Sequence, residues 1–104
     1  MGRTEIDRRA PRRAVTEHIQ CRIDGRTVMV TVHDLSEGGC QLEGLAGWAH
    51  EGSRVVLKIG GFQCPPGRIA WLMDRSAGVA FEGSLHPAIL DRIAPPISSA
   101  WTGR

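Results

Sequence analysis

The sequence predicts a mainly β protein: a small six-stranded antiparallel β-barrel followed by one C-terminal helix. Short runs of alternating apolar and polar residues recur through the middle of the chain, which is typical of half-buried strands. Turn-forming residues separate these runs, with 13 glycines and 6 prolines among 104 residues. Connections this short leave no room for crossover helices, so we expect antiparallel pairing within one domain, and the pattern by itself allows a sandwich as well as a barrel.

The firmest local prediction is a β-hairpin at the start of the barrel. In residues 14–23 apolar side chains alternate with polar ones, with Glu17 as the exception. Residues 26–33 place Val28, Val30 and Val32 on one face. Between the two runs, Asp24-Gly25 is a strong turn signal, because glycine accepts a positive φ without steric cost.

Four further strands are expected at residues 40–43, 54–59, 68–73 and 77–82, with a loop at 63–67. Only residues 85–94 repeat apolar side chains at helical spacing, with Ser84 as the expected N-cap. We expect the apolar stripe of this helix to pack on the barrel, and a partner-binding face is the alternative. The predicted organisation is a flexible basic N-terminal arm at 1–13, the barrel with its helix at 14–94, and a tail at 95–104.

Positive charge is concentrated near the N-terminus. The formal net charge is only +2, yet five arginines lie between Arg3 and Arg13. Such a segment attracts an anionic partner, or it is simply a solvated arm.

The sequence carries no apolar run that resembles a membrane span or a signal peptide. The three cysteines, Cys21, Cys40 and Cys64, lack the spacing of a metal site or a disulfide framework. We expect each to be a small buried side chain in a reducing compartment. The expectation is therefore a cytoplasmic protein without membrane insertion.

Motifs of catalytic sites are absent from the sequence. The four histidines do not lie at metal-ligand spacing, and no nucleophile elbow, P-loop or dinucleotide-binding motif occurs. Asp34 and Ser36 near His33 suggest a triad, but side chains so close on a strand and its exit point in divergent directions. We expect no enzymatic activity, no catalytic residue, no metal and no cofactor.

Two motifs separated by the predicted hairpin give the strongest functional signal. The first is RRAPRR at residues 8–13, in which arginines recur four apart twice. The second is DLSEGG at residues 34–39, directly after the second predicted strand.

These motifs resemble the PilZ family, whose mark is Arg-x-x-x-Arg before the first strand and Asp/Asn-x-Ser-x-x-Gly after the second. In this sequence the second pattern matches Asp34, Ser36 and Gly39. The resemblance continues through GRIAW at 67–71, GVAF at 78–81 and the terminal helix, and covers about residues 8–94. It implies a PilZ-type barrel that binds cyclic di-GMP, changes the conformation of its arm, and signals to a downstream protein partner.

The chemistry of cyclic di-GMP agrees with this resemblance. Guanidinium groups pair bidentately with phosphate, reach guanine O6 and N7, or stack on the base. Asp34 would accept hydrogen bonds from guanine N1–H and N2–H₂, Ser36 would add a hydroxyl contact, and the glycines would let the backbone approach the ligand. The alternative for Asp34 and Ser36 is an ordinary turn that caps itself. The candidate ligand-binding residues are Arg8, Arg9, Arg12, Arg13, Asp34, Ser36, Gly38 and Gly39.

The choice between the two arginine pairs depends on strand parity. With Val15 pointing inward, the parity favours Arg8 and Arg12 as the ligand pair, and Arg9 with Arg13 is the second choice.

Aromatic residues bear on the remaining alternatives. Trp71, on a central strand, is expected in the core, with stacking on a guanine as the alternative. For Trp48, in the connection between two strands, the sequence does not favour either position. A nucleic-acid-binding barrel would offer more aromatic side chains than two Phe, three Trp and no Tyr. A protein-interaction module of the same fold without nucleotide binding is the other alternative, and the intact motifs count against it. The sequence leaves open the regulated process, the partner, the ligand stoichiometry and the oligomeric state.

Overall fold

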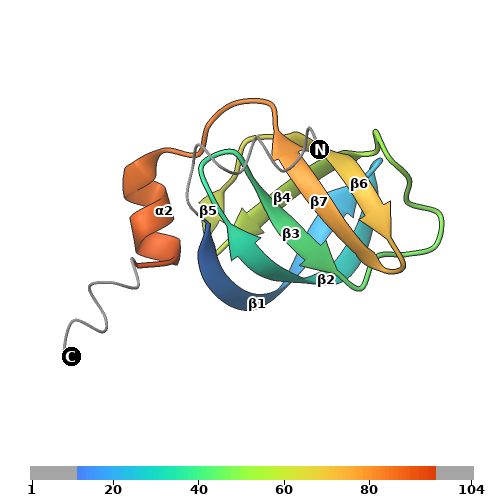
Figure 1. Cartoon of the computed structure of the whole chain (residues 1–104), viewed down its shortest axis with the longest axis horizontal. Coiled ribbons are helices and arrows are strands. Elements are labelled where there is room, and N and C mark those ends of the chain that lie inside the picture. Colours follow the sequence, from blue (N-terminus) through green and yellow to red (C-terminus); the bar gives the residue numbers. More distant parts are fainter. Residues whose placement is uncertain (1–11, 96–104) are drawn as a thin grey trace.

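Six strands form a closed antiparallel barrel, the architecture that the family resemblance implies (Figure 1). The computed structural model describes residues 12–95. The strands of the barrel are β1 (Arg13–Ile23), β2 (Arg26–Leu35), β3 (Gly39–Glu43), β4 (Arg54–Ile59), β6 (Gly67–Met73) and β7 (Ser76–Phe81). Their order is β1-β2-β3-β7-β6-β4, and pairing of β4 with β1 closes the ring.

One additional short strand lies outside the closed ring. β5 (Phe62–Gln63) pairs with the end of β4 through the turn at Gly60 and Gly61. The sequence predicted a loop at 63–67, and Gln63 belongs to this strand instead. The correction is small because the pairing covers only two residue pairs.

The predicted turn between β1 and β2 is confirmed. Asp24 and Gly25 have φ values of 51° and 84°, the left-handed conformation that a tight hairpin requires. The turn is attached to β4, because the Asp24 N–H donates to the Arg54 carbonyl at 2.9 Å and the Arg54 N–H donates to the Asp24 carboxylate at 3.0 Å. The hydrogen bond from the Arg54 N–H to the Asp24 carboxylate lowers the pKa of Asp24, and a side-chain hydrogen bond with Ser53 lowers it further.

The barrel interior is apolar, as the alternation predicts. The three cysteines are buried free thiols, which confirms the expectation that each is a small buried side chain. Burial raises the pKa of Cys21 and of Cys64 to about 11, and raises the pKa of Cys40 as well. The largest fully buried apolar side chains include Ile23, Leu35, Leu42, Leu45, Ile59, Leu85 and Leu90.

The helix α2 (Pro87–Ile93) lies at one end of the barrel, next to β1 and β5 (Figure 1). Its N-cap is His86, whose Nδ1 accepts the Ala88 N–H at 3.0 Å, so the prediction of Ser84 as the cap was wrong. His86 directly precedes Pro87, which suits the first helical position. Leu90 is buried, so the apolar stripe packs on the barrel as expected. No helix among the described residues is long and apolar enough to cross a membrane.

Candidate functional site

Three β-bulges interrupt the strands of the described chain. They lie in β1 between Ala14 and Glu17, in β2 between Val32 and Leu35, and in β6 between Ile69 and Trp71. Each adds one residue to one strand of a pair, and in β2 and β6 the side chains beyond the bulge change the face to which they point. The bulges in β2 and β6 decide the orientation of two candidate site residues.

The bulge in β2 sets the position of Asp34. Val32 and Leu35 are both fully buried although they are three residues apart, so the intervening His33 and Asp34 lie toward the outer side. β2 extends two residues beyond the predicted end at 33, and Asp34 therefore belongs to the strand. It is half-buried rather than on a solvated loop tip.

Arg12 and Asp34 bring the two sequence motifs together. Arg12 Nη1 lies 3.7 Å from Asp34 Oδ2, with the two side chains 50% and 35% exposed. At this exposure solvent screens the pair, whose contribution to stability is below about 1 kcal/mol. The contact therefore matters for placement: it brings an arginine of the first motif beside the aspartate of the second.

Arg13 points away from this contact. It forms an ion pair with Asp91 of α2, and its Nη1 donates a hydrogen bond to the Ala94 carbonyl at 3.0 Å. Neighbouring side chains on a strand point to opposite sides, so Arg12 and Arg13 serve different surfaces. Arg8 and Arg9, the other two predicted arginines, lie outside the described residues.

Ser36 shapes the loop between β2 and β3. Its hydroxyl accepts the Gly38 N–H at 3.2 Å and donates to the Gly39 carbonyl at 3.4 Å, and its own N–H donates to the same carbonyl at 2.9 Å. The residue is buried. This is the geometry of a self-capping turn, the alternative that the sequence left open for Ser36.

The same loop is held by two neighbouring segments. The Phe81 N–H of β7 donates to the Gly38 carbonyl at 2.8 Å. The Leu85 N–H, on the chain leading into α2, donates to the Glu37 carbonyl at 2.9 Å. The loop is thus fixed from both the barrel and the helical segment.

Gly39 is required by the packing of strands. A Cβ at this position would lie 2.0 Å from the Val79 carbonyl oxygen of β7. Because the obstacle is backbone of a paired strand, it cannot move aside without breaking the β3–β7 pairing. The structure thus explains Gly39 by strand contact, where the sequence suggested close approach of a ligand.

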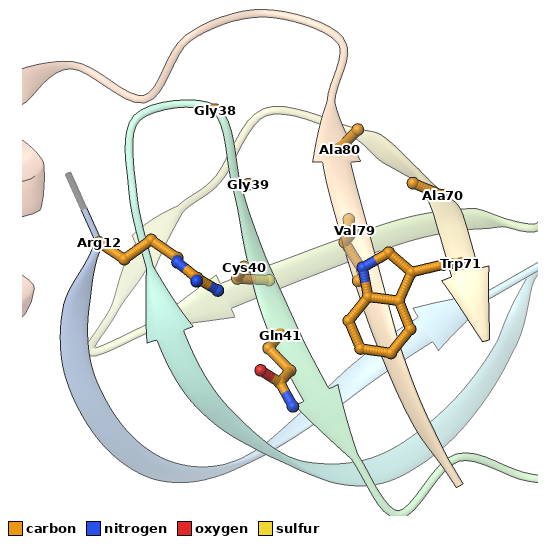
Figure 2. Close-up of a pocket in the computed structure, with 10 residues that line it drawn as sticks. Arg12, Gly38, Gly39, Cys40, Gln41, Ala70, Trp71, Val79 and Ala80 are labelled. Carbon is orange, nitrogen blue, oxygen red and sulfur yellow. The ribbon is translucent and has the colours of Figure 1, made fainter. Parts of the chain in front are cut away.

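A pocket open to solvent lies on the outer face of β3, β7 and β6 (Figure 2). Arg12 extends toward it from one side and the indole of Trp71 lies on the other, with Gln41 between them. The pocket is lined by Arg12, Gly38, Gly39, Cys40, Gln41, Ala70, Trp71, Gly78, Val79 and Ala80. Three predicted residues are among them, namely Arg12, Gly38 and Gly39.

The expectation that Trp71 belongs to the core was wrong. Ile69 is buried and Leu72 packs against the core, so the extra residue in the bulge, Ala70, turns Trp71 outward. The half-buried indole lies against Gly78 of the neighbouring strand. Trp48 does not line this pocket: the residue is 38% exposed, and the Arg26 guanidinium lies 4.6 Å from the centroid of its ring.

Gln41 is a pocket residue that sequence reasoning missed, and Trp71 is one that it gave only as the alternative to a core position. Gln41 was recoverable, because it lies between the inward-facing Cys40 and Leu42 and alternation places it outside. The outward position of Trp71 could not be predicted, because the local sequence pattern does not indicate the bulge. Within residues 12–95 no group of His, Cys, Asp and Glu side chains is placed to hold a metal ion.

The fold and the site define a small β-barrel domain with a basic segment before its first strand and an outer pocket beside that segment. The family model of the PilZ domain matches residues 6–93, and the chain belongs to the PilZ family. This is a family of receptor domains for cyclic di-GMP, which bind rather than catalyse. No curated protein and no solved structure matches the chain.

Proposed function

We propose that this domain is a cytoplasmic, non-catalytic receptor that binds cyclic di-GMP between its N-terminal arginines and the pocket on β3, β7 and β6. The observation that carries the proposal is the position of Arg12, which lies at once beside Asp34 and at the pocket. A nucleotide with anionic phosphates and planar bases matches a guanidinium that has a carboxylate beside it and an indole across the pocket from it.

Each residue has a distinct role in the proposal. Arg12, together with Arg8, binds phosphate and guanine, whereas Arg13 is held by Asp91 and Ala94 and takes no part. Asp34 accepts the guanine N1–H and N2–H₂. Trp71 offers a face for base stacking, with Gln41 as a polar neighbour. Ser36, Gly38 and Gly39 act by holding the loop in shape.

The test is calorimetric titration with cyclic di-GMP, with GMP as the control ligand. One charge-assisted contact contributes roughly 1.5–3 kcal/mol, so Arg12→Ala should weaken binding about ten- to hundredfold. Arg75→Ala is the control, since it removes the same charge at an exposed turn position that does not line the pocket. Equal affinities for the parent and the Arg8→Ala/Arg12→Ala double variant would refute the proposal.

The role of Asp34 has its own test. Adenine lacks the N1–H and N2–H₂ donors that a carboxylate accepts, so Asp34→Ala should weaken cyclic di-GMP more than cyclic di-AMP. Equal losses for the two nucleotides would make Asp34 a residue that merely positions Arg12.

We further propose that the arm closes over the bound nucleotide and that a protein partner reads the closed arm. The residues before Pro11 carry Arg8 and Arg9, and trypsin cleaves after Arg9 because no proline follows it. Saturating cyclic di-GMP should slow this cut and leave cleavage after the exposed Arg75 unchanged. Equal cleavage rates with and without the ligand would remove the arm from the mechanism.

The alternative is an interaction module of the same fold that binds no nucleotide. Its supporting observation is that Ser36 is already satisfied within its loop. Calorimetric titration distinguishes the two proposals. An interaction module that binds no nucleotide would show no heat of binding with cyclic di-GMP, even at the highest protein concentration that stays in solution.

A further inference from the structure

Most of the residues that line the pocket on β3, β7 and β6 present little or no side chain to it. Five of them have no side chain or a single methyl group, namely Gly38, Gly39, Ala70, Gly78 and Ala80. Two more, Cys40 and Val79, belong to the barrel core. The large polar or aromatic side chains of the pocket are those of Arg12, Gln41 and Trp71 (Figure 2). Their chemistry therefore decides which groups of a ligand fit there.

Gln41 and the indole of Trp71 belong to the same part of the pocket. Gln41 of β3 and Gly78 of β7 are direct cross-strand partners, and the indole rests against Gly78. Gln41 points outward, because its neighbours Cys40 and Leu42 are buried. A base stacked on the indole would therefore turn one of its edges toward the Gln41 amide.

The amide of Gln41 is available to a ligand. The residue is half-buried, and its side chain forms no hydrogen bond with any residue in 12–95. The polar side chains on the other side of the pocket differ in this respect, because the Arg12 guanidinium already lies 3.7 Å from the Asp34 carboxylate. A ligand can therefore use both the oxygen and the nitrogen of the Gln41 amide.

An amide accepts either purine, whereas a carboxylate does not. The Gln41 Oε1 can accept guanine N1–H while its NH₂ group donates to O6, and the same amide turned over donates to adenine N1 and accepts from N6–H₂. The ionised Asp34 carboxylate only accepts hydrogen bonds. Guanine offers it the two donors N1–H and N2–H₂, but adenine offers N6–H₂ beside an N1 lone pair that repels it. Asp34 therefore requires guanine, and Gln41 does not distinguish the two bases.

We propose that the domain also binds hybrid cyclic dinucleotides that carry one guanine and one adenine, such as cyclic GMP-AMP. The guanine lies at Asp34, and the adenine stacks on Trp71 with its edge on Gln41. This inference rests on the proposed function, since it uses the same pocket and the same contact at Asp34. Cyclic di-AMP is a poor ligand, because one of its adenines must face Asp34.

The experiment is calorimetric titration of the full chain with 3′,3′-linked cyclic di-GMP, cyclic GMP-AMP and cyclic di-AMP. Cyclic GMP-AMP should bind within about tenfold of cyclic di-GMP, because Gln41 makes as many hydrogen bonds to adenine as to guanine. About twofold of the difference is statistical, since the symmetric ligand fits in two equivalent orientations and the hybrid in one. Cyclic di-AMP should bind roughly ten- to hundredfold more weakly than the hybrid, because it loses the charge-assisted contact to Asp34.

Gln41→Glu should make the second position as selective for guanine as the first. The new carboxylate repels the phosphates of every ligand, so the measured quantity is the dissociation constant for cyclic GMP-AMP divided by that for cyclic di-GMP. This ratio should rise about tenfold, because adenine cannot satisfy either carboxylate. Gln20→Glu is the matched control: Gln20 is exposed on β1 and does not line the pocket, so the ratio should equal that of the parent chain.

The outcomes separate this inference from the proposed function. Binding of cyclic di-GMP together with a hybrid that binds as weakly as cyclic di-AMP would overturn the inference and leave the proposed function standing. An unchanged ratio in Gln41→Glu, or an equal rise in Gln20→Glu, would also overturn it. No heat with cyclic di-GMP would refute both proposals at once. Thermal unfolding by circular dichroism verifies that the two variants retain the fold.

Discussion

The indole of Trp71 occupies the space that a side chain on Gly78 would need. The two residues are cross-strand partners in β6 and β7, and a Cβ on Gly78 would lie 2.0 Å from Trp71 Nε1. The smallest residue therefore lies under the largest, and the indole rests against the backbone at the edge of the pocket.

Gly78→Ala should destabilise the domain by about 1–3 kcal/mol, because the new methyl group forces the indole out of its position. In a Trp71→Ala background the same substitution should cost little, since the obstructing ring is gone. Urea unfolding of the four proteins gives this coupling free energy. Equal costs in the two backgrounds would show that Gly78 is needed for another reason.

Gly39 provides a contrast to Gly78. A Cβ there meets the Val79 carbonyl of a paired strand, so Gly39→Ala should be destabilising by several kcal/mol, at the upper end of single substitutions. Truncation of the Val79 side chain should not rescue it, because the obstacle is backbone. Recovery of stability in Gly39→Ala/Val79→Ala would contradict the geometry.

The ion pair between Arg13 and Asp91 should contribute modestly to stability. The side chains are 24% and 53% exposed, so solvent screening limits the coupling to about 1 kcal/mol or less. A double-mutant cycle with Arg13→Met and Asp91→Asn measures it, and the coupling should decrease as salt is added. A coupling free energy of several kcal/mol that does not change with salt concentration would contradict this, because it would require the pair to be shielded from solvent.

The turn at Asp24 predicts a specific pH dependence. The folded state lowers the pKa of Asp24 below its ordinary value of 3.8. Above that pH the carboxylate contributes its full stabilisation, and the contribution is lost as the pH falls through the folded-state pKa, because the unfolded chain takes up the proton first. Asp24→Asn should therefore flatten the loss of stability in acid.

Asp74→Asn is the control for this measurement. Asp74 has φ 56° at the other tight hairpin turn, but its carboxylate accepts no hydrogen bond from a described residue. Unfolding midpoints between neutral and acid pH should therefore follow the parent chain. A flattening as large as that of Asp24→Asn would assign the effect to net charge.

The buried thiols should resist alkylation in the folded chain. With a pKa raised to about 11, Cys21 and Cys64 are protonated at mildly alkaline pH, and the thiolate is the reactive form. Iodoacetamide labelling followed by mass spectrometry should modify all 3 cysteines in urea and none at a comparable rate without it. Stability should also fall as the pH rises above 9.0, the ordinary thiol value, since only the unfolded chain then releases protons.

The local pattern was sufficient to predict the strands of the barrel and insufficient for part of the site. Alternation in β1 and β2 identified the inward valines, because most of each strand is half-buried and regular. The same reading failed at Trp71 and shortened β2 before Asp34, because a bulge changes the parity of a strand through its pairing with a neighbour.

The sequence predicted which side chains at the start of β1 point inward, because Val15 is a large apolar residue in the alternating pattern of the strand. Val15 packs against the core, and Arg12 and Arg13 lie on opposite sides of the strand as the alternation implies. What the sequence could not supply is the partner of Arg13, because Asp91 lies on a helix at the other end of the chain.

Helix α2 and the chain leading into it contact both segments that border the Arg12 side of the pocket, which are the start of β1 and the loop at 36–39. Toward its C-terminus it holds Arg13, the residue next to Arg12, and the chain that leads into it holds the carbonyl of Glu37, next to Gly38. Through these contacts the helical segment fixes the distance between the start of β1 and the loop at 36–39. Although no residue of α2 lines the pocket, lifting the helix would release both of its borders at once.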